Sequence, residues 1–107
     1  MSGNLGVSVL LPVYLPTANV DDVRALADAI DSVLTQATTA PLEIIVIDDG
    51  TPTPVRDLMP SYAELNNVRW LRSLRNGGLV DALNRGLAEV QRQQQSLLQA
   101  LTTGGQL

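Results

Sequence analysis

Two runs of hydrophobic residues predict buried strands. Residues 7–14 read VSVLLPVY, and residues 42–47 read LEIIVI, with β-branched side chains prominent in both. Apolar side chains at consecutive positions are typical of strands covered on both faces, as in parallel sheets. A shorter run predicts a third strand near residues 68–72, where Trp70 is expected to join the core.

Helices are predicted between and after these strands. Asn19 is a candidate helix cap, and six apolar residues then recur on one helical face: Val23, Leu26, Ala27, Ile30, Val33 and Leu34. A short or kinked helix is expected over residues 55–65, with Thr53 as its cap, Pro54 at its first position and Pro60 interrupting it. A long helix is expected from about residue 78 to residue 101. Strands that alternate with helices predict a three-layer α/β fold with a parallel sheet.

The second strand runs directly into Asp48, Asp49 and Gly50. Ligands of parallel sheets collect beyond the carboxyl ends of the strands, so these residues are candidates for a binding site. The alternative is a solvated turn in which aspartates cap a helix. Because side chains alternate along a strand, the two carboxylates cannot enter the same pocket. Gly50 lets the backbone turn sharply.

Composition excludes several kinds of chemistry. The 107 residues suit one small domain and include no cysteine, histidine or lysine. Thiolate, imidazole and Schiff-base mechanisms are therefore excluded, and any metal would have only oxygen ligands, which favours Mg²⁺ or Mn²⁺ over zinc. A net charge of -4 argues against nucleic acid as a partner. The turn after the first strand contains no glycine, which argues against a dinucleotide fingerprint.

The start of the chain indicates where the protein acts. The segment MSGNLG has neither the charged region nor the apolar core of a signal peptide, and no apolar run approaches the roughly 20 residues of a membrane span. We therefore expect a cytoplasmic protein without a membrane span.

Five sequence blocks, in order, resemble the nucleotide-binding half of family 2 glycosyltransferases, inverting enzymes of the GT-A fold. The blocks are VSVLLPVY, AIDSVLTQ, LEIIVIDDGTPTP, VRWLRS and NGGLVDALNRGLAEV. The resemblance implies a Rossmann-like half-domain with strand order 3-2-1 over residues 1–90. Residues 91–107 are expected to form a helical extension and tail.

The resemblance also implies a nucleotide site. Pro12, Val13 and Tyr14 would line the base pocket, with the tyrosine ring over the base. Asp49 would accept a hydrogen bond from the N3 proton of uracil. The loop residues Asn76 and Gly78 would lie near the nucleotide.

The sequence also predicts roles near this site for Arg75, Asp48 and Arg85. Arg75 is expected either to contact the diphosphate or to be an exposed charge. Asp48 is expected to be structural and to accept hydrogen bonds within the following loop, for example from Thr51 or Thr53. Where the family has Ala-Arg-Asn, this chain has Ala82, Leu83 and Asn84, so an arginine function would pass to Arg85 or elsewhere.

The family's catalytic residues have no counterparts in the sequence. Members continue into a fourth strand ending in Asp-x-Asp, which holds a divalent ion, yet no Asp-x-Asp occurs here. We assign no catalytic residue, metal ligand or cofactor to the chain, and expect Mg or Mn only in a full-length member. The prediction is the nucleotide-sugar-binding portion of a glycosyltransferase that uses a UDP-like donor. The alternative is a non-catalytic nucleotide-binding or oligomerisation module derived from such an enzyme.

Self-association is the last expectation from the sequence. In the family the fourth strand would neighbour the first, so here the first strand is expected to have an open edge. Leucines and a valine then form a broken stripe along the last helix: Leu79, Leu83, Leu87, Val90, Leu97, Leu98 and Leu101. We therefore expect a homodimer, associated through the edge of the first strand and this helix.

Overall fold

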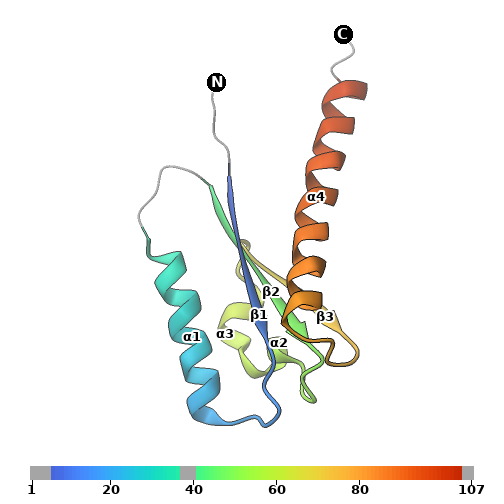
Figure 1. The fold of residues 1–107 in the computed structure, drawn as a ribbon. Coiled ribbons are helices and arrows are strands. Elements are labelled where there is room, and N and C mark those ends of the chain that lie inside the picture. The colour runs from blue at the N-terminus through green and yellow to red at the C-terminus, as the bar shows by residue number, and fades with distance from the viewer. Residues whose placement is uncertain (1–5, 37–40, 105–107) are drawn as a thin grey trace.

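A three-stranded parallel sheet forms the middle layer of the chain (Figure 1). The structure is a computed structural model that describes residues 6–36 and 41–104, and over residues 95–104 it describes only the course of the backbone. Its elements are β1 (Val7–Val13), α1 (Val20–Leu34), β2 (Leu42–Asp49), α2 (Val55–Leu58), α3 (Pro60–Ala63), β3 (Val68–Ser73) and α4 (Leu79–Gly104).

The strand order is β1-β2-β3, which confirms the predicted order 3-2-1. Val9 pairs with Ile44, and Ile44 pairs in turn with Val68, so β2 lies in the centre with a neighbour on each side. A central strand is covered on both faces by helices, which explains why its sequence is apolar at consecutive positions.

The two faces of β2 contribute to two separate apolar clusters. Ile44 and Val46 face α1, α2 and α3, where the larger cluster also contains Leu26 and Ile30 of α1. On the other face, Ile45 and Ile47 pack with Ala82 of α4. All four β2 side chains are fully buried. The period of two along β2 thus produces the three-layer α/β arrangement seen in Figure 1, as predicted.

The helix before β2 begins as its sequence predicts. The Asn19 side chain accepts a hydrogen bond from the Asp21 amide at 2.8 Å and caps α1. Asp21 and Asp22 occupy the first turn, where negative charge suits the helix dipole.

The segment after β2 differs from the prediction at its start. Thr53 is not the cap of α2, because Pro54 occupies that position and makes no side-chain capping bond. The first amide of the helix, that of Val55, instead donates to the carboxylate of Asp48 at 2.9 Å. The expected interruption is present: α2 ends at Leu58, Met59 leaves helical geometry, and Pro60 begins α3.

The long helix α4 packs on β1 and β2 and continues well beyond the sheet (Figure 1). Gly86 permits close packing, because a Cβ there would lie 2.9 Å from Cδ1 of Ile47 and 3.1 Å from a methyl carbon of Leu10. Glu89, only 6% exposed, pairs with Arg69 of β3 and with Arg92 on the next turn of the helix. Among the described residues, no helix combines the length and apolarity needed to cross a membrane.

Gly50 directly follows β2 and lies against the loop that leads into α4. Its φ is +82°, and a Cβ there would lie 2.8 Å from Cα of Arg75 and closer still to the Arg75 carbonyl carbon and the Asn76 nitrogen. Gly78 also has a positive φ, +95°, but a Cβ there would meet no atom within 4 Å. The two glycines therefore differ in steric demand although their conformations are similar.

We predict that Gly50→Ala lowers the free energy of unfolding more than Gly78→Ala does. The Gly78 substitution should cost about 1–2 kcal/mol, the strain of a side chain in left-handed backbone. The Gly50 substitution should cost at least about 1 kcal/mol more, because the backbone of the neighbouring loop must also move. Urea unfolding of both variants measures the difference, and equal costs would contradict the close approach.

The second prediction concerns Tyr62 of α3, whose hydroxyl donates to Asp31 of α1 at 2.8 Å. This hydrogen bond, with partial burial and the negative charges of Asp31 and Asp28, raises the pKa of Tyr62 above its ordinary value. A raised pKa stabilises the folded state at pH values below about 10, and that stabilisation is lost as the pH rises and the phenol ionises.

An ultraviolet titration of tyrosine ionisation tests this prediction. Asp31→Asn should lower the pKa of Tyr62, while Tyr62→Phe removes this titration. The advantage in unfolding free energy of the unmodified protein over Tyr62→Phe should shrink above about pH 10. An advantage that does not change with pH would show that the bond to Asp31 is not maintained in solution.

Candidate functional site

A small pocket lies where the carboxyl ends of β1 and β2 meet the loop before α4. Its volume is about 180 Å³, and it is lined by Pro12, Val13, Tyr14, Asp49, Asn76, Gly78, Leu79 and Ala82. Six of the seven residues predicted to bind nucleotide are among them. A larger pocket of about 310 Å³ lies at the opposite end of the sheet, beside Gly6 and Glu43. None of the predicted residues line that pocket, so we place the candidate site in the smaller one.

Asp49 anchors the loop that forms one wall of this pocket. It follows Ile45 and Ile47 on the face of β2 that packs against α4, and it is 4% exposed. One carboxylate oxygen accepts from the amide of Gly77 at 3.0 Å, and the other accepts from the amide of Gly78 at 2.9 Å. Asp49 thus satisfies two amides at the start of α4, which are then not free to bind a phosphate.

The other predicted residues surround Asp49 to different extents. Tyr14 is 44% exposed, while Val13 is buried. Asn76 is exposed at the rim. Arg75 is exposed and is not among the residues that line the pocket. The structure therefore brings Tyr14, Asp49 and Asn76 together and leaves Arg75 outside.

Leu79 and Ala82 line the pocket but were missed by sequence reasoning. They lie three residues apart in the first turns of α4, so they fall on the same side of the helix. This spacing was the available signal, but Leu79 was predicted to contribute to self-association, and Ala82 was considered only in the comparison with the family's Ala-Arg-Asn. Together with Pro12 and Val13 they give the pocket an apolar lining.

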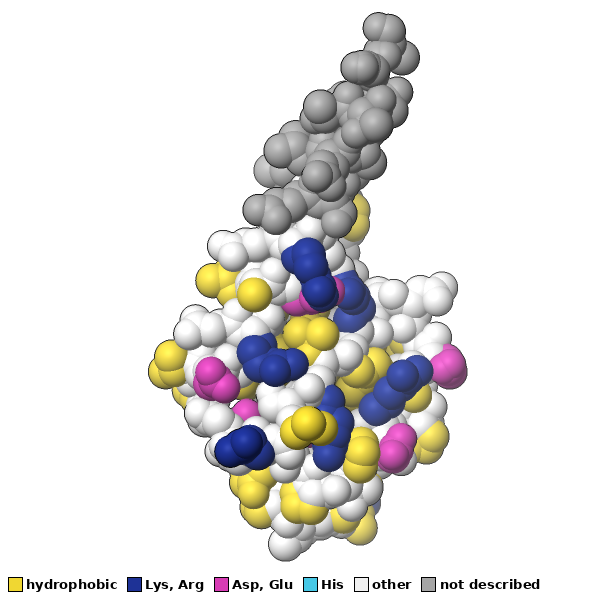
Figure 2. Space-filling model, turned by 90° about the vertical axis from the view of Figure 1, so that its right-hand side faces the viewer, with side chains coloured by type: hydrophobic (Ala, Val, Ile, Leu, Met, Phe, Trp, Pro, Cys, Tyr) yellow, Lys and Arg dark blue, Asp and Glu magenta, His cyan; other side chains and the backbone are white. Residues whose placement is uncertain are grey.

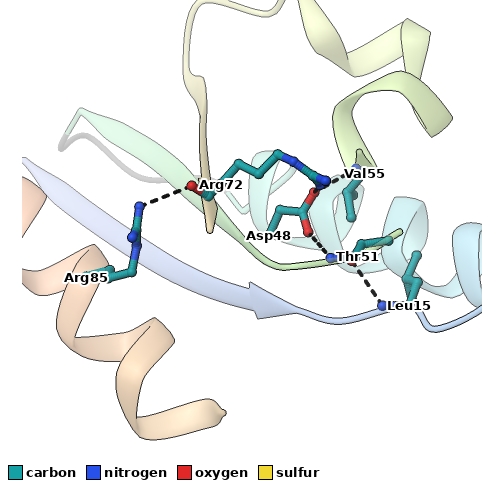
Figure 3. A network of polar contacts seen from close by, with 6 residues as sticks. All are labelled: Leu15, Asp48, Thr51, Val55, Arg72 and Arg85. Atoms are coloured by element: carbon teal, nitrogen blue, oxygen red, sulfur yellow. Dashed lines mark hydrogen bonds and ion pairs between the residues drawn. The ribbon is translucent and has the colours of Figure 1, made fainter. Parts of the chain in front are cut away.

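Asp48 faces the opposite side of the sheet and is part of a buried polar network (Figure 3). Its carboxylate accepts from the amides of Thr51 and Val55, both at 2.9 Å, and pairs with Arg72 at 2.7 Å. The Thr51 hydroxyl accepts in turn from the amide of Leu15 at 3.2 Å. The loops after β1 and β2 are therefore joined to β3 behind the pocket.

Arg85 does not replace the arginine that the family has within this helix. Its guanidinium donates to the carbonyl oxygen of Arg72 at 3.2 Å, as Figure 3 shows. It borders a separate pocket with Leu71 and Glu89, on the β3 side of α4. Since α4 carries Leu79 on its other side, Arg85 points away from the candidate site, and Arg85 is not the substitute that the sequence suggested.

Positive charge is concentrated in the second half of the chain. Six of the seven arginines lie between residues 56 and 92, and Figure 2 shows arginine side chains spread over this side of the molecule. Arg69, Arg72 and Arg92 pair with buried carboxylates. Arg75 forms no ion pair within the described residues, and it immediately precedes the pocket residue Asn76.

The carboxylates of the site do not fit a divalent cation. Within residues 6–36 and 41–104, no three acidic side chains come close enough together to hold a metal ion. Asp48 and Asp49 are separated by the sheet, and the oxygens of both already accept from N–H groups. The arrangement suits a planar ligand that places an N–H group towards Asp49 and a ring surface against Tyr14.

Comparison with known proteins gives one family match and two relatives. The family model described as glycosyl transferase family 2 matches residues 12–98. An uncharacterized glycosyltransferase EpsJ from Bacillus subtilis (strain 168) is 35% identical over 82 residues, which are 76% of this chain and 22% of that protein. A validoxylamine A glucosyltransferase from Streptomyces hygroscopicus subsp. limoneus is 36% identical over 80 residues, 64% of this chain and 17% of that protein. No solved structure matches the chain.

The matched region includes the ends of β1 and β2, the loop before α4 and the first half of α4, and so contains the whole pocket. The chain spans about a fifth of the length of the curated relatives it matches. Its three parallel strands and flanking helices correspond to a truncated, Rossmann-like half of the GT-A fold. On the extent of the family match, the chain belongs to glycosyltransferase family 2.

Proposed function

We propose that this chain is the nucleotide-sugar-binding portion of an inverting glycosyltransferase with a UDP-like donor. The observation that carries the proposal is the pocket itself. Residues from three distant segments, among them Tyr14, Asp49 and Asn76, line one cavity at the carboxyl edge of a parallel sheet. Ligands of open α/β sheets bind at this edge.

In the proposed complex the base enters between Tyr14 and the start of α4. The half-exposed ring of Tyr14 offers a flat surface, and Leu79 and Ala82 form the apolar wall opposite β1. Pro12 and Val13 form the floor. Asn76 and Gly78 stand at the rim beside the ribose, and Arg75 is close enough in sequence to reach the diphosphate from outside the pocket.

Asp49 gives the proposed site its preference for uracil. A carboxylate has about four lone-pair positions, and the amides of Gly77 and Gly78 use two of them. Another position can accept the N3 proton of uracil. Cytosine has an acceptor at N3, so two acceptors would face each other with no proton between them, which costs about 1–3 kcal/mol.

Sugar transfer needs two groups that the described residues do not supply. The acceptor hydroxyl requires a base, and the departing diphosphate requires positive charge or oriented donors. Asp49 is the only carboxylate among the residues that line the pocket, and it is held by two amides. We infer that the chain binds the donor and that the chemistry depends on groups outside it.

The second candidate is a non-catalytic module that binds a nucleotide or serves in oligomerisation. The lack of Asp-x-Asp in the sequence favours it, as does the row of exposed leucines on α4. The contacts expected of Leu97, Leu98 and Leu101 in self-association lie outside the described side chains. An oligomerisation module need not bind nucleotide, and sugar transfer by the chain would exclude a non-catalytic module.

We predict that the chain binds UDP weakly, without added metal, and more tightly than CDP. Loss of a charged hydrogen bond costs about 1.5–3 kcal/mol, so Asp49→Asn should weaken UDP binding by roughly ten- to a hundredfold. Asparagine keeps the shape of the side chain and can donate to N3 of cytosine, so the preference for UDP over CDP should disappear. Titration calorimetry measures all four affinities.

The comparison of the two nucleotides separates base recognition from loop anchoring. If Asp49 only positions the loop, its substitution weakens UDP and CDP binding by the same factor. Asp28→Asn on the exposed surface of α1 is the matched control and should leave both affinities unchanged. Absence of heat with UDP in the unmodified protein would refute the proposed site.

A further prediction is that the isolated chain does not transfer sugar. Electrostatic stabilisation of the leaving group is often the largest contribution to catalysis, and the described residues do not assemble it. Purified protein should release no more UDP from a panel of UDP-sugars and acceptors than Asp49→Asn does. Turnover clearly above that control would contradict this prediction and would exclude the non-catalytic candidate.

A further inference from the structure

The ring of Tyr14 has no polar contact of its own to fix its direction. The side chain is 44% exposed, and its hydroxyl makes no hydrogen bond with the residues that the structure describes. β1 ends one residue earlier, at Val13. The place of the ring at the candidate pocket therefore depends on the backbone of the loop that follows, residues 15–18.

A buried hydroxyl group holds this loop. The Leu15 amide donates to Oγ1 of Thr51 at 3.2 Å, and within the described part of the chain this is the one hydrogen bond made by residues 15–18. The Thr51 side chain is 1% exposed. Leu15 also packs its side chain against the apolar cluster that contains Ile44 and Val46. The backbone of Leu15 is thus fixed both by its amide and by its side chain.

Fixing Leu15 also sets the direction of the residue before it. Val13 and Leu15 both contact the cluster on the α1 side of the sheet, whereas Tyr14 between them lines the pocket beside α4. This is the alternation of an extended chain, in which neighbouring side chains point in opposite directions. A change in the backbone at Leu15 therefore turns the Tyr14 ring towards or away from the pocket.

Thr51 is itself attached to the rigid part of the sheet. Its amide donates to Asp48 at 2.9 Å, and Asp48 pairs with Arg72 of β3 at 2.7 Å. Figure 3 shows this series of contacts, which ends at the amide of Leu15. The Thr51 hydroxyl therefore has a defined place before any ligand binds.

We propose that Thr51 is a positioning residue, which sets the Tyr14 ring for stacking on the base. This inference rests on the proposed function, since it concerns the same pocket. Thr51 does not line the pocket, so it acts through Leu15 and Tyr14 and not by contact with the ligand. Aromatic rings stack on every base, whereas the carboxylate of Asp49 distinguishes uracil from cytosine. Thr51 thus contributes to affinity and not to the choice of base.

A double-mutant cycle with Tyr14 tests this role. Thr51→Val keeps the shape of the side chain but removes the hydroxyl, and it should weaken UDP binding by roughly five- to tenfold in an NMR titration. In a Tyr14→Ala background the same substitution should weaken binding by less than about twofold, because the ring that Thr51 positions is gone. Thr51→Ser retains the hydroxyl and should bind UDP as the unmodified protein does. Thr53→Val, at an exposed threonine two residues away, is the matched control.

The ratio of UDP to CDP affinity identifies the route of the effect. Thr51 is only two residues from Asp49, and a substitution that acts through that carboxylate changes the preference for UDP. Action through Tyr14 weakens UDP and CDP binding by the same factor, which is the expected result for Thr51→Val. A changed preference would assign the effect to Asp49 and overturn the positioning of Tyr14.

Hydrogen exchange measures the contact without any ligand. The Leu15 amide should exchange about tenfold faster or more in Thr51→Val than in the unmodified protein or Thr51→Ser. Urea unfolding establishes that the variants are folded, and Thr51→Ala replaces the valine variant if the latter is not. Unchanged exchange, or equal weakening of UDP binding in both Tyr14 backgrounds, overturns this inference and leaves the proposed function intact. A lack of UDP binding by the unmodified protein overturns the proposed function, and the role of Thr51 with it.

Discussion

The buried carboxylate of Asp48 is the constraint on which the rest of the structure depends. At 3% exposure it accepts from two loop amides and pairs with Arg72, and so holds the end of β2, the start of α2 and β3 together. Removing one partner of a fully buried pair costs about 3–5 kcal/mol, and the cost here is smaller because the Arg72 side chain is 35% exposed. The exposed pair Arg56–Glu64 contributes only about 0–1 kcal/mol by comparison.

The two adjacent aspartates have different contacts because successive side chains of a strand point to opposite faces of the sheet. Asp48 lies on the same face of β2 as Ile44 and Val46 and binds the loop behind the sheet, while Asp49 faces α4 and binds the loop in front of it. Because Gly50 has no side chain, the backbone of that loop can pack directly against it. The wall of the candidate site is therefore held by contacts that exist before any ligand arrives, so binding requires little reorganisation of the backbone.

Local pattern was enough to predict the three strands, whereas the strand order and the residues of the candidate site came from the resemblance to family 2 glycosyltransferases. The apolar run of β2 indicated a central strand, and alternation indicated that Asp48 and Asp49 face opposite ways. The sequence did not reveal partners that depend on distant segments. Arg72 is the partner of Asp48, and Glu89 pairs with two arginines. At the start of α2, Asp48 accepts the hydrogen bond that was expected from a Thr53 cap. Only the folded chain brings these residues together.

The size of the pocket limits what this chain can hold. Pockets for small ligands commonly measure about 300–1,000 Å³, whereas the candidate site is near 180 Å³. A cavity of that size encloses a base but not a whole nucleotide-sugar. In the complex that we propose, the ribose, diphosphate and sugar would therefore extend past Asn76 and Arg75, and most of the donor would gain no burial from the pocket. This is the reason that we expect weak binding by this chain.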